Sequence, residues 1–207
     1  MIRRLTALLS NASPPADIGE VPSTPLADRL ETLSRDPYLW VARPPLNIIS
    51  VFDDLKYDRS DLDMMSAPMR ERVINQMAPL GFRQTSGRIL ESSADDVRVI
   101  FPKFQALGAS PFDIARYRDR RPQDYLALTP TQTACQLIDH YDHGEAVEQV
   151  KALITKQPIN IYRLMDYLEH KPAHRDFLNA IGHLKFVQRE ALESEALKGR
   201  RALGSIG

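Results

Sequence analysis

Apolar residues recur at helical spacing in four stretches of the second half of the chain. The first stretch follows Thr129, which suits a helix N-cap; Pro130 suits the first helical position, and Gln132 lies where a capping box needs its second partner. Four amphipathic helices with short connections predict a helical bundle over residues 128–197. Their apolar positions are Ala134, Leu137, Ile138 and Tyr141; Val147, Val150 and Ile154; Ile161, Leu164, Met165 and Leu168; and Phe177, Ala180, Ile181 and Leu184.

The first half mixes helical and strand patterns. From residue 25 onward they predict a helix, a strand over 46–52, a short helix, a longer helix and two strands. The longer helix opens near Pro68 and places three apolar side chains on one face, those of Met69, Val73 and Met77. This order of elements is that of a winged helix, with the longer helix in the position of the recognition helix.

The two strands are predicted at 82–90 and 97–101, with a polar hairpin turn between them at 91–96. In a winged helix this turn is the wing. We therefore predict an α+β fold, in which a winged-helix-like lobe with a small antiparallel sheet over residues 25–104 precedes the helical bundle.

Three segments lack a regular pattern. Residues 1–24 are rich in proline and serine, which predicts a flexible leader. Residues 105–127 predict an irregular connecting segment that packs against the body, because its apolar residues are too many for a free linker. Residues 198–207 predict a flexible tail.

Charge and composition narrow the function classes. The chain of 207 residues carries 27 Lys+Arg and 27 Asp+Glu, so it lacks the overall basic charge of many nucleic-acid-binding proteins. No apolar run has the length of a membrane span, and the short apolar start does not resemble a complete secretory signal. The single cysteine, Cys135, cannot form an internal disulfide. These features predict a cytoplasmic protein.

Catalytic and metal-binding patterns are weak. The five histidines include two pairs at helical spacing, His140 with His143 and His170 with His174. We interpret the first pair as helix-end residues, and Pro172 separates the second pair, so we assign neither pair to a metal. Cys135 falls on an apolar helix face, as a buried structural cysteine does. We therefore assign no catalytic residue, no metal ligand and no cofactor to this chain.

Two surfaces are candidates for binding. An extended peptide could pair beside the second strand, at Val97, Val99 and Phe101, and contact the face of Met69, Val73 and Met77. A dense arginine segment with aromatic neighbours is the candidate interface with a partner protein. Its residues are Phe112, Arg116, Tyr117, Arg118, Arg120 and Arg121. Aspartates within the same segment offset its charge, which favours internal ion pairs over contact with nucleic acid.

Several phrases of the sequence resemble the small partner protein of methanobactin biosynthesis cassettes. They are Phe52-Asp53-Asp54-Leu55, Phe101-Pro102-Lys103-Phe104, Ser110-Pro111-Phe112-Asp113, Leu128-Thr129-Pro130-Thr131-Gln132 and Pro158-Ile159-Asn160. The resemblance spans most of residues 35–203.

This resemblance implies a non-catalytic subunit that pairs with a TIM-barrel, iron-dependent oxidase and binds the leader of a precursor peptide. The oxidase would convert precursor cysteines, with dioxygen, into oxazolone–thioamide groups of a copper chelator, and the iron would belong to the partner. Two alternatives stay open: a winged-helix DNA-binding regulator or antitoxin, and a hydrolase or transferase that uses His140, His174 or His183.

Overall fold

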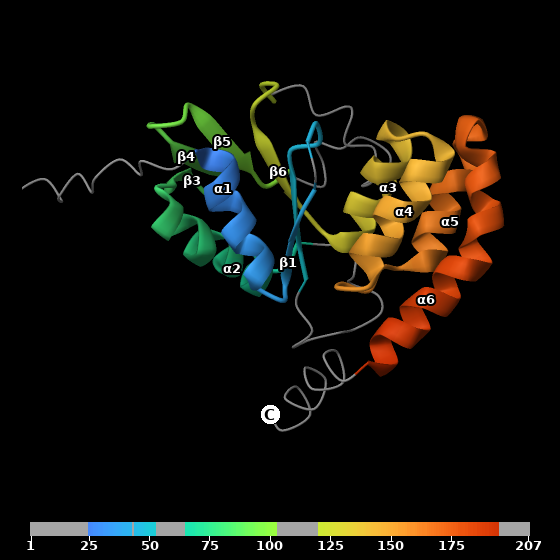
Figure 1. Ribbon diagram of the computed structural model, residues 1–207. Helices are drawn as coiled ribbons and strands as arrows, with labels where there is room; N and C mark the ends of the chain where they lie inside the picture. The colour runs from blue at the N-terminus through green and yellow to red at the C-terminus, as the bar shows by residue number, and fades with distance from the viewer. Residues whose placement is uncertain (1–24, 43, 53–64, 103–119, 195–207) are drawn as a thin grey trace, which may run out of the picture.

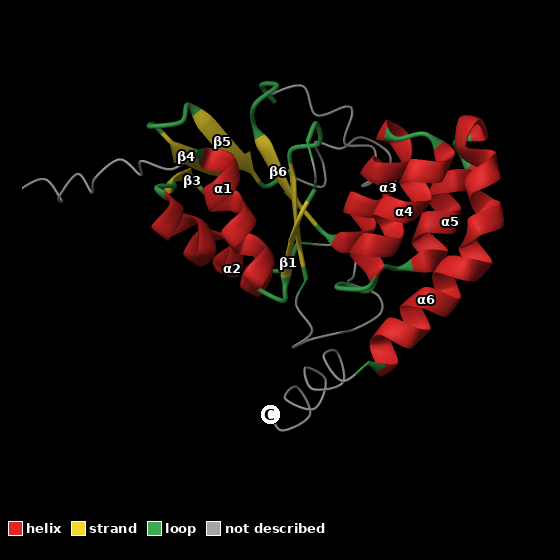
Figure 2. Ribbon diagram, viewed as in Figure 1, coloured by secondary structure: helices red, strands yellow, loops and turns green. Residues whose placement is uncertain are grey.

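The computed structural model describes residues 25–42, 44–52, 65–102 and 120–194. Within these ranges a mixed sheet of six strands is combined with six α-helices, so the fold is α+β (Figures 1 and 2). The predicted leader and tail lie outside the described residues, as does most of the connecting segment. The strands are β1 (Leu39–Val41), β2 (Ile48–Val51), β3 (Arg83–Ser86), β4 (Ile89–Ser92), β5 (Val97–Ile100) and β6 (Tyr125–Leu128).

The helices divide between the two halves of the chain. The first half contributes α1 (Leu26–Glu31) and α2 (Ala67–Met77), followed by the short 3₁₀ helices at Thr32–Arg35 and Ala78–Leu80 respectively. The second half contributes α3 (Pro130–His140), α4 (His143–Ile154), α5 (Ile161–Glu169), the 3₁₀ helix η5 (Pro172–Ala180) and α6 (Ile181–Glu193). None of the helices in the described ranges has the length and apolar character that crossing a membrane requires.

The sheet order is β1-β2-β6-β5-β4-β3. β6 pairs in parallel with both β2 and β5, and the remaining pairs are antiparallel. The prediction of a small antiparallel sheet is therefore wrong. It missed β6, which falls in the segment predicted to be irregular. Leu126, Ala127 and Leu128 are all buried, because helices cover both faces of this central strand, so the strand lacks the alternation that marks a half-exposed one.

The predicted strand over 82–90 is divided in the structure. A tight turn at Gly87 and Arg88 separates β3 from β4, and the two strands pair with each other in antiparallel fashion. The polar turn ahead of β5 occupies residues 93–96. The sequence pattern merged β3 and β4 because the turn between them is only two residues long.

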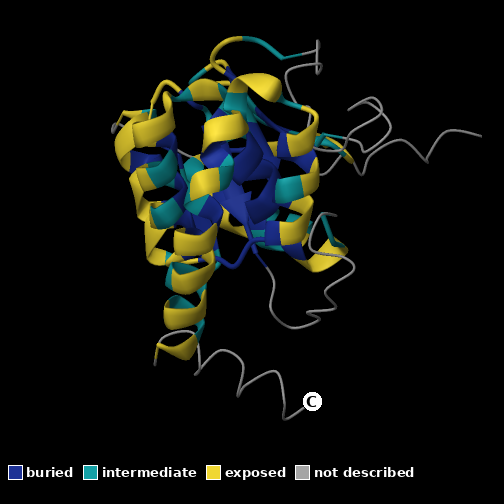
Figure 3. Ribbon diagram, turned by 90° about the vertical axis from the view of Figure 1, so that its right-hand side faces the viewer, coloured by how far each residue is buried: buried dark blue, intermediate teal, exposed yellow. Residues whose placement is uncertain are grey.

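Two separate apolar clusters cover the two faces of the sheet. On one face α1 and α2 pack against residues such as Val51, Leu90 and Val99. On the other face α3 to α6 pack against residues such as Ile48 and Leu126. Figure 3 views the second group of helices from outside, with exposed residues on their outer turns and buried residues behind. The sheet thus lies between two helical layers (Figure 1).

Local signals place the helix starts correctly. The hydroxyl of Ser66 accepts from the backbone N–H of Met69 at the start of α2, and Pro68 occupies the first turn. Thr129 and Gln132 form the predicted capping box of α3, in which each side chain accepts from the other residue's backbone N–H. Gly81 has φ 90° and ends the 3₁₀ turn after α2, a conformation that glycine adopts without strain.

Candidate functional site

Among the described strands, β3 has the most exposed residues, and it forms one edge of the sheet. All four of its residues are exposed, and within the described residues it pairs only with β4. Its outer side therefore presents N–H and C=O groups that an added strand can use. At the opposite edge, Leu39 and Trp40 of β1 are buried. β3 is thus the edge that is open to an extended ligand.

The predicted peptide-contacting residues have a different place. Met69, Val73, Met77, Val97, Val99 and Phe101 are each at most 6 % exposed and belong to the apolar cluster under α1 and α2. β5 lies between β4 and β6, so neither of its edges can accept another strand. The prediction that a peptide pairs beside β5 is therefore wrong. The prediction failed because β6 was not foreseen: β6 pairs with the edge of β5 at which the peptide was expected.

Two cations of α2 are engaged within the chain. Arg72 forms an ion pair with Asp36, with Nη1 3.0 Å from Oδ2, and its guanidinium lies 4.2 Å from the ring centre of Tyr38. The guanidinium of Arg70 lies 5.8 Å from the ring centre of Phe101. Both side chains thereby fasten α2 to the body of the protein.

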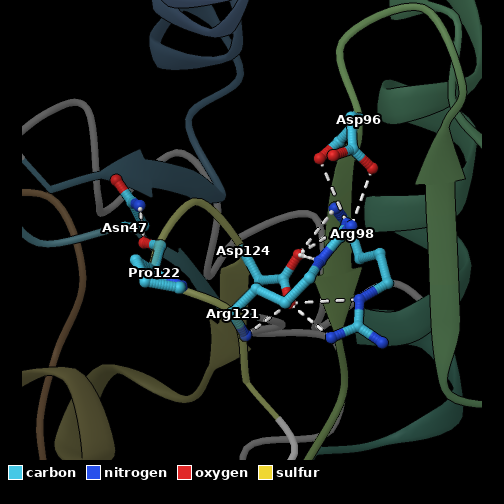
Figure 4. Close-up of polar contacts among 6 residues, drawn as sticks. All are labelled: Asn47, Asp96, Arg98, Arg121, Pro122 and Asp124. Atoms are coloured by element: carbon cyan, nitrogen blue, oxygen red, sulfur yellow. Dashed lines mark hydrogen bonds and ion pairs between the residues drawn. The ribbon is translucent and has the colours of Figure 1, made fainter.

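The described part of the predicted partner interface is an ion-pair cluster around Asp124, whose carboxylate is fully buried (Figure 4). Arg98 of β5 donates to it from Nε and Nη2, and Arg121 donates from its backbone N–H and Nε. Arg121 also pairs with Asp96 at 2.7 Å. Arg121 and Asp124 thus form ion pairs within the protein, and the bonds between Arg98 and Asp124 hold the start of β6 beside β5.

The other residues of the predicted partner interface give little support to a contact with a partner. Phe112, Arg116, Tyr117 and Arg118 lie outside the described residues. Arg120 is partly buried; burial lowers the pKa of its guanidinium, and the nearby Asp124 carboxylate raises it by a smaller amount. Arg121 forms ion pairs with Asp96 and Asp124. Among the described residues of the predicted interface, Arg120 and Arg121 therefore offer little free charge to a partner.

The ion pairs of this cluster shift the pKa values of its members. Burial alone would raise the pKa of Asp124, but hydrogen bonds from Arg98 and Arg121 outweigh it and hold the pKa at about 2. The Asp124 carboxylate in turn raises the pKa of Arg98, and hydrogen bonds to Asp96 and then to Asp124 raise the pKa of Arg121. Asp124 therefore stays charged across the whole range in which the protein would function.

A further internal ion pair, which sequence patterns do not reveal, fixes the turn before β5. Arg29 of α1 is only 7 % exposed and donates to Asp95 and to the carbonyl of Leu80. The hydroxyl of Ser92 donates to the same carboxylate. Burial would raise the pKa of Asp95, but the hydrogen bonds from Ser92 and Arg29 lower it. No spacing rule links Arg29 to Asp95, so only the fold shows the contact.

The histidines are dispersed among the helices. Nε2 of His174 lies 3.1 Å from Oδ1 of Asp139, which also pairs with Lys171 and accepts from the hydroxyl of Tyr167. His140 packs edge-on against Tyr141, and His143 edge-on against Phe177. Over the described ranges, no group of three or more histidine, cysteine or acidic side chains is arranged to hold a metal ion.

Cys135 has the position expected of a structural residue. It is fully buried in α3, among the apolar residues that face the sheet. A thiol in such surroundings is inert as a nucleophile.

Comparison with known proteins gives no relative from which a role could be transferred. No protein-family model matches the chain, and searches of curated proteins and of solved structures also find no match.

Proposed function

We propose that this chain is a peptide-binding, non-catalytic subunit of an oxidase complex. In this proposal α1, α2 and β3 to β5 act as a winged-helix-like recognition lobe, and α3 to α6 as a supporting helical bundle. The observation that carries the proposal is the β3 edge, whose exposed residues and free outer side suit strand addition. The contact with the peptide is thereby assigned to β3 in place of β5.

The register of the sheet suggests which peptide would bind. Arg83, Glu91 and Arg98 lie opposite one another across β3, β4 and β5, so they form a row of alternating charge on one face. A strand added outside β3 would place one of its side chains beside Arg83. Because opposite charges in neighbouring strands stabilise pairing, we expect an acidic residue at that position of the peptide.

The partner and the reaction rest on the resemblance to the methanobactin cassette protein. We propose that the partner is a TIM-barrel oxidase that binds iron and converts precursor cysteines into oxazolone–thioamide groups in the cytoplasm. This chain would present the leader of the precursor. No step of that chemistry is assigned to its own residues.

Purification from the native host tests the partnership. The chain should co-elute with an iron-containing oxidase, and the iron should follow the partner when the two are separated. Stoichiometric iron bound to the isolated chain would contradict the proposal. So would tight, steeply salt-dependent binding of duplex DNA, which the alternative of a DNA-binding regulator predicts.

A proline scan tests the contact at β3. Successive N–H groups of a strand point to opposite sides, so one of Arg83→Pro and Gln84→Pro removes an outward donor while the other removes a bond to β4. We expect one of these variants to keep its fold and lose precursor binding by about tenfold or more. Gln84→Ala keeps the backbone donor and should bind like the wild type. Equal binding by all three variants would overturn the assignment to β3.

A further inference from the structure

A cavity of about 270 Å³ lies among the end of α3, the start of α4 and the 3₁₀ helix η5. It is on the helical side of the molecule and has no residue in common with the β3 edge. Ile138, Ala146 and Phe177 supply an apolar surface within it. Such a cavity is smaller than most drug-sized ligand sites, so it suits a single side chain.

The two imidazoles of the cavity are held by their neighbours. The ring of His143 packs edge-on against the ring of Phe177, with 6.1 Å between the ring centres. His174 is paired with Asp139, which Lys171 and Tyr167 also contact. The aromatic walls are therefore already in place before a ligand arrives.

Two carboxylates complete the lining. Asp142 caps α4, and its Oδ1 accepts from the backbone N–H of Glu145 at 3.0 Å, which leaves Oδ2 able to accept from a ligand. Asp176 lines the cavity as well, and among the described residues it has no hydrogen-bonding or ion-pair partner. Asp142 and Asp176 are both exposed, so they lie at the open mouth of the cavity, where a ligand can reach them. The carboxylates of Asp142 and Asp176 contribute two negative charges, whereas the N-terminus of α4 contributes about half a positive charge. The cavity is thus electrostatically suited to a cation.

We propose that this cavity binds an arginine side chain of a partner polypeptide. The aliphatic stem would lie along Ile138 and Ala146, and the planar guanidinium would stack against the aromatic walls. Its several N–H groups can donate to two carboxylates, such as those of Asp142 and Asp176, better than a single ammonium group can. This inference is independent of the peptide contact at β3 and of the identity of the oxidase.

Titration with blocked amino acids tests the proposal on the whole chain. The probe is N-acetyl-arginine methylamide, followed by the ring C–H resonances of His143 and His174 in NMR spectra. We expect saturable shifts at both rings and none at His183, which does not line the cavity. The citrulline analogue has the same shape without the charge and should bind at least about tenfold more weakly. Equal binding of citrulline, or preferred binding of the glutamate analogue, would overturn the proposal.

Variants locate the binding. Asp176→Asn and Asp142→Asn should each weaken arginine binding by about three- to tenfold. Asparagine also caps helices well, so the second change keeps the start of α4. Asp166→Asn, at an exposed carboxylate of α5 that does not line the cavity, is the matched control and should have no effect. Unchanged binding in both cavity variants would refute the site, and tighter binding of agmatine than of blocked arginine would refute a polypeptide source.

Discussion

Ser50 of β2 donates its hydroxyl to Oε1 of Gln157 at 2.5 Å, and both side chains are fully buried. Gln157 follows α4 and also donates from Nε2 to the carbonyl of Tyr38 at 2.8 Å. One amide group therefore joins the helical layer to two segments at the β1 side of the sheet. The contact spans 107 positions of the chain and is polar within an otherwise apolar interface.

Replacement of the Gln157 amide should lower the free energy of unfolding. In Gln157→Leu the buried hydroxyl of Ser50 loses its acceptor, and we expect a loss of about 2 kcal/mol in the free energy of unfolding. Urea denaturation measures the change. Gln76→Leu, at an exposed position of α2, is the matched control and should stay within about 0.5 kcal/mol of the wild type. Equal stability of the two variants would show that the buried bridge contributes nothing.

Loss of the Asp124 carboxylate should lower the free energy of unfolding more than loss of the Gln157 amide does. Asp124→Asn leaves the guanidinium groups of Arg98 and Arg121 beside an uncharged amide, and we expect a loss of about 3 kcal/mol. Asp166→Asn removes a carboxylate that is exposed and 4.0 Å from Arg163, so it should cost under about 0.5 kcal/mol. Thermal or urea unfolding gives both values, and a cost for Asp124→Asn as small as that of the control would be inconsistent with an anchoring role.

The same carboxylate predicts a dependence of stability on pH. The pKa of Asp124 is lowered from 3.8 to about 2 on folding, so its contribution is complete above about pH 4 and is lost as the pH falls toward 2. The contribution is at most about 2 kcal/mol, and solvent around the arginines reduces it. The difference in unfolding free energy between the wild type and Asp124→Asn should therefore shrink over this range, from about 3 kcal/mol by at most about 2 kcal/mol. Parallel curves would contradict the assignment.

Cys135 offers a test of the core around α3. Because its thiol is fully buried, a thiol reagent should label it only when the protein opens. We expect negligible labelling under native conditions and a rate that rises with urea in step with unfolding. Stoichiometric labelling of the native protein within seconds would show that α3 is more accessible than the packing indicates.

Sequence patterns predicted the features that depend on neighbours in the chain. The capping box of Thr129 and Gln132 is one, because its partners are three residues apart. The apolar face of α2 is another, since Met69, Val73 and Met77 repeat at helical spacing, although the sequence assigned this face to a peptide and the structure buries it in the core. These signals require no knowledge of the tertiary structure.

The features that the sequence missed depend on distant partners. The central position of β6 depends on pairing with β2 and β5, which no local pattern encodes. The same gap explains the misplaced peptide site, because whether β5 has an open edge is a property of the whole sheet. The arginine cavity was missed for a related reason: Asp142 and Asp176 are close only through the packing of α4 against η5.

The position of β6 also bears on how the chain acquires its structure. β6 is the last strand within the described residues and fills the middle of the sheet, so β2 and β5 each have a bare edge until residues 125–128 have left the ribosome. Up to that moment the nascent chain holds two incomplete pieces of sheet that can pair with other molecules. A fragment that ends at residue 119 should accordingly self-associate in sedimentation experiments, whereas the whole chain does not expose those edges. Synthesis of β6 thus closes the bare edges of β2 and β5, and α3 to α6, which follow it in the chain, then cover the face that β6 shares with them.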